Sequence, residues 1–155
     1  MITVVQRVRW ARVLVDDEVV GAIERGALLL VCAEQGDGEA DAIETARKIT
    51  SLRLLQGRTP LDRTLLEEGA ACLVISQFTL AAELRRGNRP DFTAAAPPAV
   101  AEPLYELVAQ RLRDSGLPVA TGRFGASMLV ESANDGPVTL TLTVRQGAVV
   151  PRSGS

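Results

Sequence analysis

Apolar residues alternate with polar ones, or form short unbroken runs, across the first third of the chain, and both patterns predict strands. The predicted strands are residues 2–8, 12–15, 19–23 and, as a fully apolar run, 27–32. The acidic pair Asp16-Asp17 separates two of these segments, as a hairpin turn does. This part of the chain therefore reads as β-structure.

Two later segments carry apolar residues three or four positions apart, with charges between them, as an amphipathic helix requires. The first begins at Glu39 and places Ala42, Ala46, Ile49 and Leu52 on one face. The second follows Pro97-Pro98, places Leu104, Leu107, Val108 and Leu112 on one face, and ends near Gly116 and Pro118. Each helix should pack its apolar face on the sheet.

Further strands are predicted at residues 71–75, 127–132 and 138–144. The last has the clearest period of two, because valine and leucine alternate there with threonine. Residues 56–69 are polar and interrupted by glycine and proline, which indicates a connection with at most a short ordered piece. Residues 81–98 form a long segment without period, and such loops are often functional.

These elements predict a single α/β domain over residues 1–145. We expect a strongly curved, barrel-like and mostly antiparallel sheet covered by two main helices, because most of the predicted strands are joined by hairpin-length links. Residues 146–155 lose all pattern and are expected to be a flexible tail.

Composition limits the partners. The chain has 155 residues, 46% of them hydrophobic, with 17 basic and 19 acidic side chains, so no general cationic face attracts nucleic acid. Any RNA contact must use a local group of charges. Arginines at positions 7, 9 and 12 interrupt the N-terminus, and no stretch has membrane-spanning length, so we expect a cytoplasmic protein without a membrane partner.

The chain contains no histidine, which excludes Ser-His-Asp and Cys-His catalysis and histidine-ligated zinc. Its carboxylates are scattered, so we expect no metal site and no cofactor. Cys32 and Cys72 lie in apolar runs and are expected to be buried, reduced thiols. A hydrolase with this composition needs a general base other than imidazole.

Several motifs occur together in a fixed order. They are Ser76-Gln77-Phe78-Thr79-Leu80, Thr121-Gly122-Arg123-Phe124-Gly125-Ala126 and Asn134-Asp135-Gly136-Pro137-Val138-Thr139, with Val5-Gln6-Arg7-Val8 and residues 96–106 beside them. In order and spacing, from about Met1 to Val144, the chain resembles the D-aminoacyl-tRNA deacylase family. The resemblance implies a homodimeric hydrolase that performs chiral proofreading in translation quality control. It would cut the ester between a D-amino acid, or glycine, and the 3′ end of tRNA.

Residues 134–137 alone would be read as a tight turn between two strands. The resemblance instead implies that the Gly136-Pro137 bond is cis and enters the active site of the partner subunit. There its carbonyl groups would face the α-carbon of the substrate and exclude an L side chain by contact.

Residues 76–79 alone would be read as the solvent end of a strand. The resemblance makes them the catalytic pocket, in which N–H groups near Gln77 and Phe78 stabilise the oxyanion. A lone threonine without a base is poorly activated, so we expect Thr79 to position groups while water attacks with help from the 2′-hydroxyl of the terminal adenosine.

Other site residues follow from the same resemblance. Arg7, which could be an ordinary edge-strand cation, would hold the Gly-Pro loop. The substrate would contact Ser76, Phe124 and Met128, of which the last two could equally be core residues. Arg85, Arg86 and Arg89, otherwise a solvated loop, would contact phosphates of the tRNA acceptor end, and DNA is not an expected partner.

Two regions depart from the family pattern. Asp91 stands where a small hydroxylic residue is usual, and it could affect either loop geometry or RNA affinity. Residues 59–67 match poorly, with Asp62 and Arg63 in place of an asparagine-centred turn.

Two alternatives remain at this stage. The missing catalytic side chains and acidic balance also fit a module that binds a small ligand or an RNA end without turnover. A hydrolase of the same fold with a trans Gly-Pro bond would cleave L-aminoacyl esters as well. The bond geometry distinguishes the last possibility.

Overall fold

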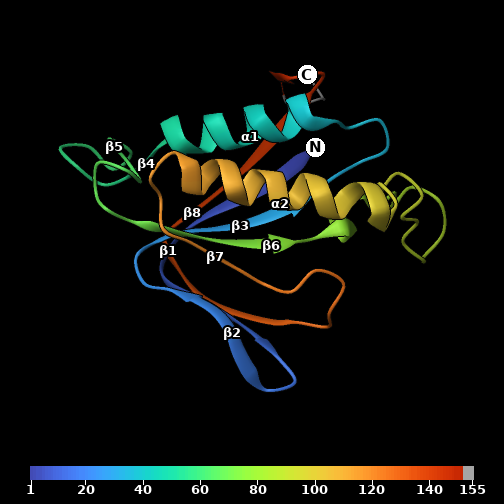
Figure 1. Ribbon diagram of the computed structural model, residues 1–155, viewed down its shortest axis with the longest axis horizontal. Helices are drawn as coiled ribbons and strands as arrows, with labels where there is room; N and C mark the ends of the chain where they lie inside the picture. Colours follow the sequence, from blue (N-terminus) through green and yellow to red (C-terminus); the bar gives the residue numbers. More distant parts are fainter. Residues whose placement is uncertain (152–155) are drawn as a thin grey trace.

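The structure is a computed structural model that describes residues 1–151, and it consists of one curled sheet with two helices on one face (Figure 1). The main sheet contains β1 (Ile2–Val15), β2 (Glu18–Ile23), β3 (Gly26–Cys32), β6 (Ala71–Ser76), β7 (Val119–Thr121), β8 (Leu129–Arg145) and β9 (Ala148–Val149). The helices are α1 (Glu39–Ser51), α2 (Pro98–Asp114) and the 3-10 helix η1 (Phe78–Ala81), and β4 (Arg53–Leu55) pairs separately with β5 (Arg63–Thr64).

The strand order is β7-β6-β3-β1-β8-β9, with β2 paired to the outer part of β1. β1 runs antiparallel to β2, β3 and β8, whereas β3, β6 and β7 are parallel to one another. The connection from β3 to β6 includes α1, and the connection from β6 to β7 includes α2, as parallel strands require. The expected α/β class, mostly antiparallel curled sheet and two main helices are confirmed.

Two pairs of predicted strands are each one long strand. Residues 2–8 and 12–15 belong to β1, and residues 129–132 and 138–144 belong to β8, which begins at Leu129 rather than at Ser127. Each strand leaves the layer under the helices and curls away, so its middle becomes exposed and polar. This exposure interrupts the alternation of apolar residues along the sequence, which is why each long strand is predicted as two.

The reading of residues 134–137 as a turn between strands is wrong. Asn134 pairs with Val8 and Thr139 with Gln6, so the chain keeps the same partner strand and direction on both sides. The extra residues form a bulge in β8, which re-aims the backbone without reversing it. Residues 134–138 are called the Gly-Pro bulge below.

The acidic hairpin is confirmed. Asp16 and Asp17 have φ angles of 49° and 63°, the left-handed values of a two-residue turn that matches the twist of the strands. In the expected tail, Ala148 and Val149 form β9 against the end of β8, so regular structure extends past residue 145. Residues 152–155 lie outside the described part of the chain.

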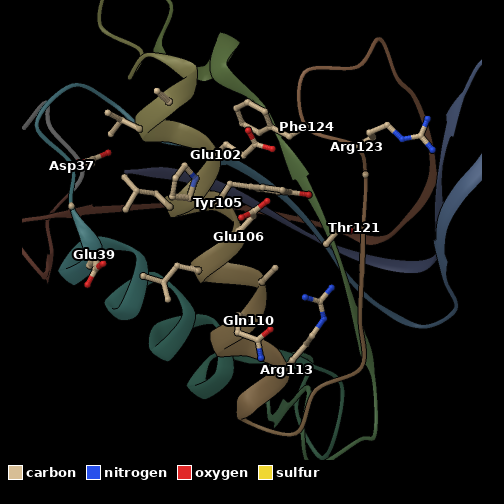
Figure 2. A pocket seen from close by; sticks show the side chains of 18 residues that line it. Asp37, Glu39, Glu102, Tyr105, Glu106, Gln110, Arg113, Thr121, Arg123 and Phe124 are labelled. Atoms are coloured by element: carbon tan, nitrogen blue, oxygen red, sulfur yellow. The ribbon is translucent and has the colours of Figure 1, made fainter.

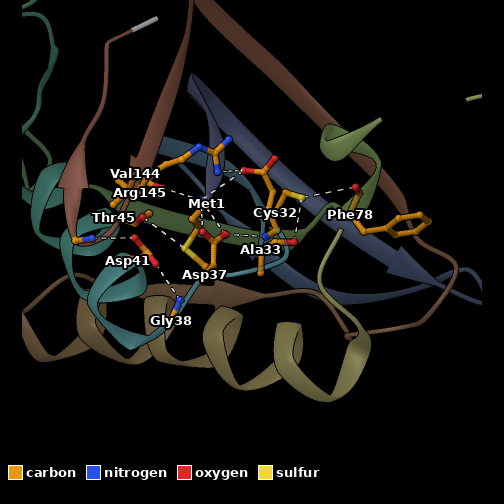
Figure 3. A network of polar contacts seen from close by, with 12 residues as sticks. Met1, Cys32, Ala33, Asp37, Gly38, Asp41, Thr45, Phe78, Val144 and Arg145 are labelled. Carbon is orange, nitrogen blue, oxygen red and sulfur yellow. Dashed lines mark hydrogen bonds and ion pairs between the residues drawn. The ribbon is translucent and has the colours of Figure 1, made fainter. Parts of the chain in front are cut away.

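Polar contacts attach the end of β8 to the start of α1 (Figure 3). The Asp41 carboxylate accepts hydrogen bonds from the N–H groups of Gly38 and Gly147, each at 2.9 Å. Burial opposes ionisation of Asp41, but the Gly147 and Gly38 amides outweigh it, and the pKa is lowered. Arg145 pairs with Glu34 in the same network.

The core has one part on each face of the sheet. The helix side packs residues such as Leu29, Ile49, Val74 and Leu112, and the curled side packs Val8, Val13, Leu73 and Ile75. Both cysteines are buried and free, as expected. Burial raises the pKa of Cys72 to about 12.

Candidate active site

A cavity of about 570 Å³ opens where β3 and β6 end and η1 begins. Its remaining walls come from the start of α2, the Phe124–Ala126 turn and the beginning of β8. The cavity collects five of the expected site residues: Ser76, Gln77, Phe78, Phe124 and Met128. Thr79 follows directly in η1 and is exposed.

Aromatic rings build the apolar walls. Phe78 and Phe92 meet edge to face with ring centroids 5.2 Å apart, and Tyr105 lies 6.0 Å from Phe124. The Tyr105 hydroxyl donates to the Val74 carbonyl at 2.9 Å, and burial raises its pKa, so this wall is uncharged. Sequence reasoning missed Phe92, which lies outside the motifs, and Tyr105, which lies in the matching segment 96–106 but was assigned no place in the site.

Gly122 makes room for one wall of the cavity. A Cβ at this position would lie 2.7 Å from the Met128 sulfur and 3.1 Å from Ile75 Cδ1. The absence of a side chain therefore lets Met128 pack inward. This explains why glycine precedes the Arg123-Phe124 pair.

Backbone donors are available at the start of η1. The first N–H groups of a helix lack intrahelical acceptors, and among residues 1–151 no acceptor is found for the N–H groups of Phe78 and Thr79. The Gln77 N–H differs from expectation because it donates to the Val31 carbonyl at 2.8 Å. It extends the β3–β6 ladder, so the free adjacent donors lie one residue later.

No side chain at the cavity has the setting of an activated nucleophile. The Thr79 hydroxyl accepts a hydrogen bond from the Gln77 side-chain amide, which is not a base. Cys32 lines the cavity, and its sulfur lies 3.6 Å from the Phe78 carbonyl oxygen. Burial, then the charge of Glu34, raises the Cys32 pKa to about 11, so the thiol is neutral near pH 7.

Arg7 is buried rather than an exposed edge cation, with 9% of its surface accessible. Its Nε donates to the Asp135 carbonyl at 2.9 Å, and its Nη1 donates to the Leu54 and Pro60 carbonyls at 3.2 and 3.0 Å. The guanidinium thus joins the Gly-Pro bulge to the segment around β4. Such fixed, charge-assisted bonds restrict the backbone on both sides.

The bulge is tightly packed around Gly136. The Gly136-Pro137 peptide bond is cis, and Gly136 has a φ of 129°. A Cβ on Gly136 would lie 2.9 Å from Arg7 Nη2 and 2.8 Å from Val138 Cγ2. The Asn134 side chain bridges the base of the bulge, donating to Thr139 Oγ1 at 2.8 Å and accepting from the Val138 N–H at 3.1 Å.

The structure does not bring the bulge and the cavity together within one chain. No residue from 134–138 lines the cavity, and neither does Arg7. Figure 1 shows the bend of β8 beside β4 and β5, whereas the loop between β6 and α2 lies at the opposite end of the sheet.

The arginine loop beyond η1 is only partly free. Arg85 pairs with Glu83 at 2.9 Å, whereas Arg86 and Arg89 have no carboxylate partner within residues 1–151. The Asp91 carboxylate accepts from the Thr93 N–H at 2.8 Å, and the Asp91 backbone pairs with Glu83. In this structure Asp91 therefore stabilises loop geometry.

A second hollow of about 990 Å³ follows α2 and shares Tyr105 and Phe124 with the cavity (Figure 2). Glu102 and Glu106 lie along it, and Arg113 lies near its far end. Carboxylates repel phosphate, so this side of the aromatic wall is less suited to an RNA backbone than the arginine loop.

Among residues 1–151 no group of three or more acidic, cysteine or histidine side chains is placed to hold a metal ion. No helix in the same range is both long and apolar enough to cross a bilayer.

Related proteins agree on one family. A sequence profile of the D-Tyr-tRNA(Tyr) deacylase family matches residues 4–143. A Ruegeria pomeroyi protein named D-aminoacyl-tRNA deacylase is 52% identical over 145 residues, covering 93% of this chain and 100% of the relative. A Roseiflexus protein of the same name is 52% identical and covers 92% of each chain.

Solved structures share the fold. The structure titled c-Myc DNA Unwinding Element Binding Protein superposes with a TM-score of 0.87 at 35% identity, covering 94% of this chain and 99% of the other. A probable eukaryotic D-amino acid tRNA deacylase has a TM-score of 0.76 at 15% identity, covering 90% and 97%, which shows the fold alone. By sequence and by fold, the chain belongs to the D-Tyr-tRNA(Tyr) deacylase family.

Proposed function

We propose that the chain hydrolyses D-aminoacyl-tRNA as a homodimer in which the Gly-Pro bulge of each copy enters the cavity of the other. The D-aminoacyl-tRNA deacylase reaction itself follows from the family and its relatives. The observation that carries the dimeric arrangement is the separation of the cavity from the rigid bulge within one chain. A second copy related by a twofold axis can supply each cavity with one bulge.

In the proposed reaction the backbone supplies the electrostatic catalysis. The free N–H groups of Phe78 and Thr79 receive the ester carbonyl and stabilise negative charge on its oxygen as water attacks. The 2′-hydroxyl of the terminal adenosine assists the water, because the cavity offers no histidine or ionised thiol. Thr79 and Gln77 position these groups through their mutual hydrogen bond. Collapse of the intermediate releases the amino acid and the tRNA 3′-hydroxyl.

Selectivity in this proposal is steric. The bulge places backbone beside the α-carbon, where an L side chain would have to lie, and Arg7 prevents the bulge from yielding. A D side chain points away from the bulge, and glycine has none, so both esters are accepted. Discrimination then comes from clashes with the wrong ester rather than from added contacts with the right one.

The tRNA would approach across the arginine loop. Arg86 and Arg89 are exposed in the loop that leads from η1 to Phe92, a residue that lines the cavity, so they would contact phosphates of the acceptor end without reading bases. Cys32 stays a neutral wall residue. We place the enzyme in the cytoplasm, where aminoacyl-tRNA is used.

Parallel time courses with D-tyrosyl-, L-tyrosyl- and glycyl-tRNA test the proposal, with the molar mass of the protein measured by light scattering. We expect a dimer that cleaves the D and glycyl esters and spares the L ester. Equal cleavage of D and L would remove the steric account. Binding without any cleavage would leave a module that binds the aminoacylated end.

A further inference from the structure

Arg7 connects the Gly-Pro bulge to a loop that lies outside the signature motifs. Besides the Asp135 carbonyl, the guanidinium binds Leu54 in β4 and Pro60 in the loop of residues 56–62. Leu54 is 1% exposed and fixed by the core. Pro60 is exposed, so its carbonyl depends on how the loop itself is held.

Asp62 holds that loop closed. Its Oδ2 accepts a hydrogen bond from the Arg58 N–H at 2.8 Å, and its own N–H donates to the Leu55 carbonyl at 2.9 Å. Between them, the Gly57 N–H donates to the Thr59 carbonyl at 3.0 Å. A Cβ at Gly57 would lie 2.4 Å from Asp62 Oδ2, which shows how closely the two sides pack.

We propose that Asp62 is a positioning residue for chiral selection, which it controls by fixing the Pro60 carbonyl that orients Arg7 against the Gly-Pro bulge. The inference rests on the proposed function, because the bulge selects only if it enters the partner's cavity. Without the Asp62 carboxylate the loop opens, the Pro60 carbonyl moves, and Arg7 keeps two of its three carbonyl acceptors. The bulge becomes less rigid, and the L ester gains access.

The test compares Asp62→Ala, Asp62→Asn and Glu67→Ala. Asparagine keeps a carbonyl acceptor for the Arg58 N–H. Glu67 is the matched control, because its carboxylate also accepts from a nearby backbone N–H, that of Thr64 at 2.7 Å, which lies outside the loop that carries the Pro60 carbonyl. We expect Asp62→Ala to raise the ratio of L to D cleavage about tenfold, equivalent to about 1.4 kcal/mol. The kcat/KM for D-tyrosyl-tRNA should change less than about twofold, and the other two variants should match the original ratio.

A second measurement needs no substrate. Hydrogen exchange of the Arg7 Nε–H, followed by NMR, reports its bond to the Asp135 carbonyl. Exchange should accelerate in Asp62→Ala and stay unchanged in Asp62→Asn and Glu67→Ala. Should the original chain cleave no D ester, the proposed function fails while this readout still tests the link from Asp62 to Arg7. An unchanged ratio and unchanged exchange in folded Asp62→Ala would overturn the inference, as would an Asp62→Asn variant as defective as Asp62→Ala.

Discussion

Backbone polar groups are in opposite states at the two ends of the sheet: at the cavity they are available for a ligand, and at the Gly-Pro bulge they are engaged within the protein. At the cavity, η1 leaves the N–H groups of Phe78 and Thr79 without acceptors among the described residues 1–151, and the walls are apolar rings. At the bulge, a buried guanidinium engages three carbonyl oxygens. The first end has unused donors, which suits binding of a developing negative charge. The second has its polar groups engaged, which suits a rigid steric barrier. Because the two ends are separate, we expect substitutions to change the rate of ester cleavage and the D-to-L selectivity independently.

Removing Arg7 should have the largest effect. Arg7→Ala leaves the buried Leu54 carbonyl and the part-buried Pro60 and Asp135 carbonyls without their charged donor, so we expect the free energy of unfolding to fall by about 3 kcal/mol in urea titrations. The bulge loosens, so the variant should cleave L-tyrosyl-tRNA while still cleaving the D ester. Arg7→Lys cannot reproduce the forked donor geometry, so its stability and its L-to-D cleavage ratio should lie between those of the original chain and Arg7→Ala. An Arg7→Ala variant that still spares the L ester would contradict the claim that Arg7 holds the bulge rigid for selection.

A side chain at Gly136 should have the next largest effect. Gly136→Ala forces a Cβ into Arg7 and Val138 at a φ that L residues rarely adopt. We expect at least about a tenfold change in the D-to-L rate ratio, measured by parallel deacylation assays. Gly36→Ala is the matched control, since Gly36 also has positive φ but, within the described part of the chain, no atom within 4 Å of an added Cβ. If Gly36→Ala changed the D-to-L ratio as much as Gly136→Ala, backbone strain alone would explain the change.

The arginine loop should affect affinity without affecting selection. Replacing both Arg86 and Arg89 by alanine should raise KM several-fold. It should also lower the steepness of the fall in log binding constant with log salt concentration by about 0.7–0.9 per lost phosphate contact. Arg85→Ala should have less effect, because Arg85 is engaged by Glu83. KM and the D-to-L ratio measured across a salt series separate the two properties, and a changed ratio would speak against a role limited to phosphate.

Thr79 should have the smallest effect on rate. Thr79→Ala is expected to keep kcat within about tenfold, whereas loss of a true nucleophile costs about a million-fold in the best studied hydrolases. With Cys32 neutral until about pH 11, the rate between pH 6 and 9 should show no step from a thiol, and iodoacetamide should not inactivate the enzyme. A complete loss of activity in Thr79→Ala would restore the hydroxyl as the nucleophile.

Sequence reasoning found what depends on local pattern. The helical spacing, the Asp16-Asp17 hairpin and the pocket segment at Ser76 all appear in the structure. It misplaced features that depend on distant partners. The Gln77 N–H is occupied because β6 pairs with Val31, and Arg7 is buried because Leu54 and Pro60 reach it across the fold. Residues 134–137 have turn chemistry, but pairing with β1 on both sides makes them a bulge.

The most direct test of the two-copy site is a mixed dimer, purified through two different tags. One subunit carries Ala126→Trp, which fills the cavity, and the other carries Arg7→Ala, which loosens the bulge. The open cavity then belongs to the Arg7→Ala subunit. If bulges act across subunits, this cavity faces an intact bulge, so the mixed dimer should cleave D-tyrosyl-tRNA and spare L-tyrosyl-tRNA. Cleavage of the L ester at the rate per open cavity of the Arg7→Ala homodimer, or a protein that stays monomeric, would contradict the account.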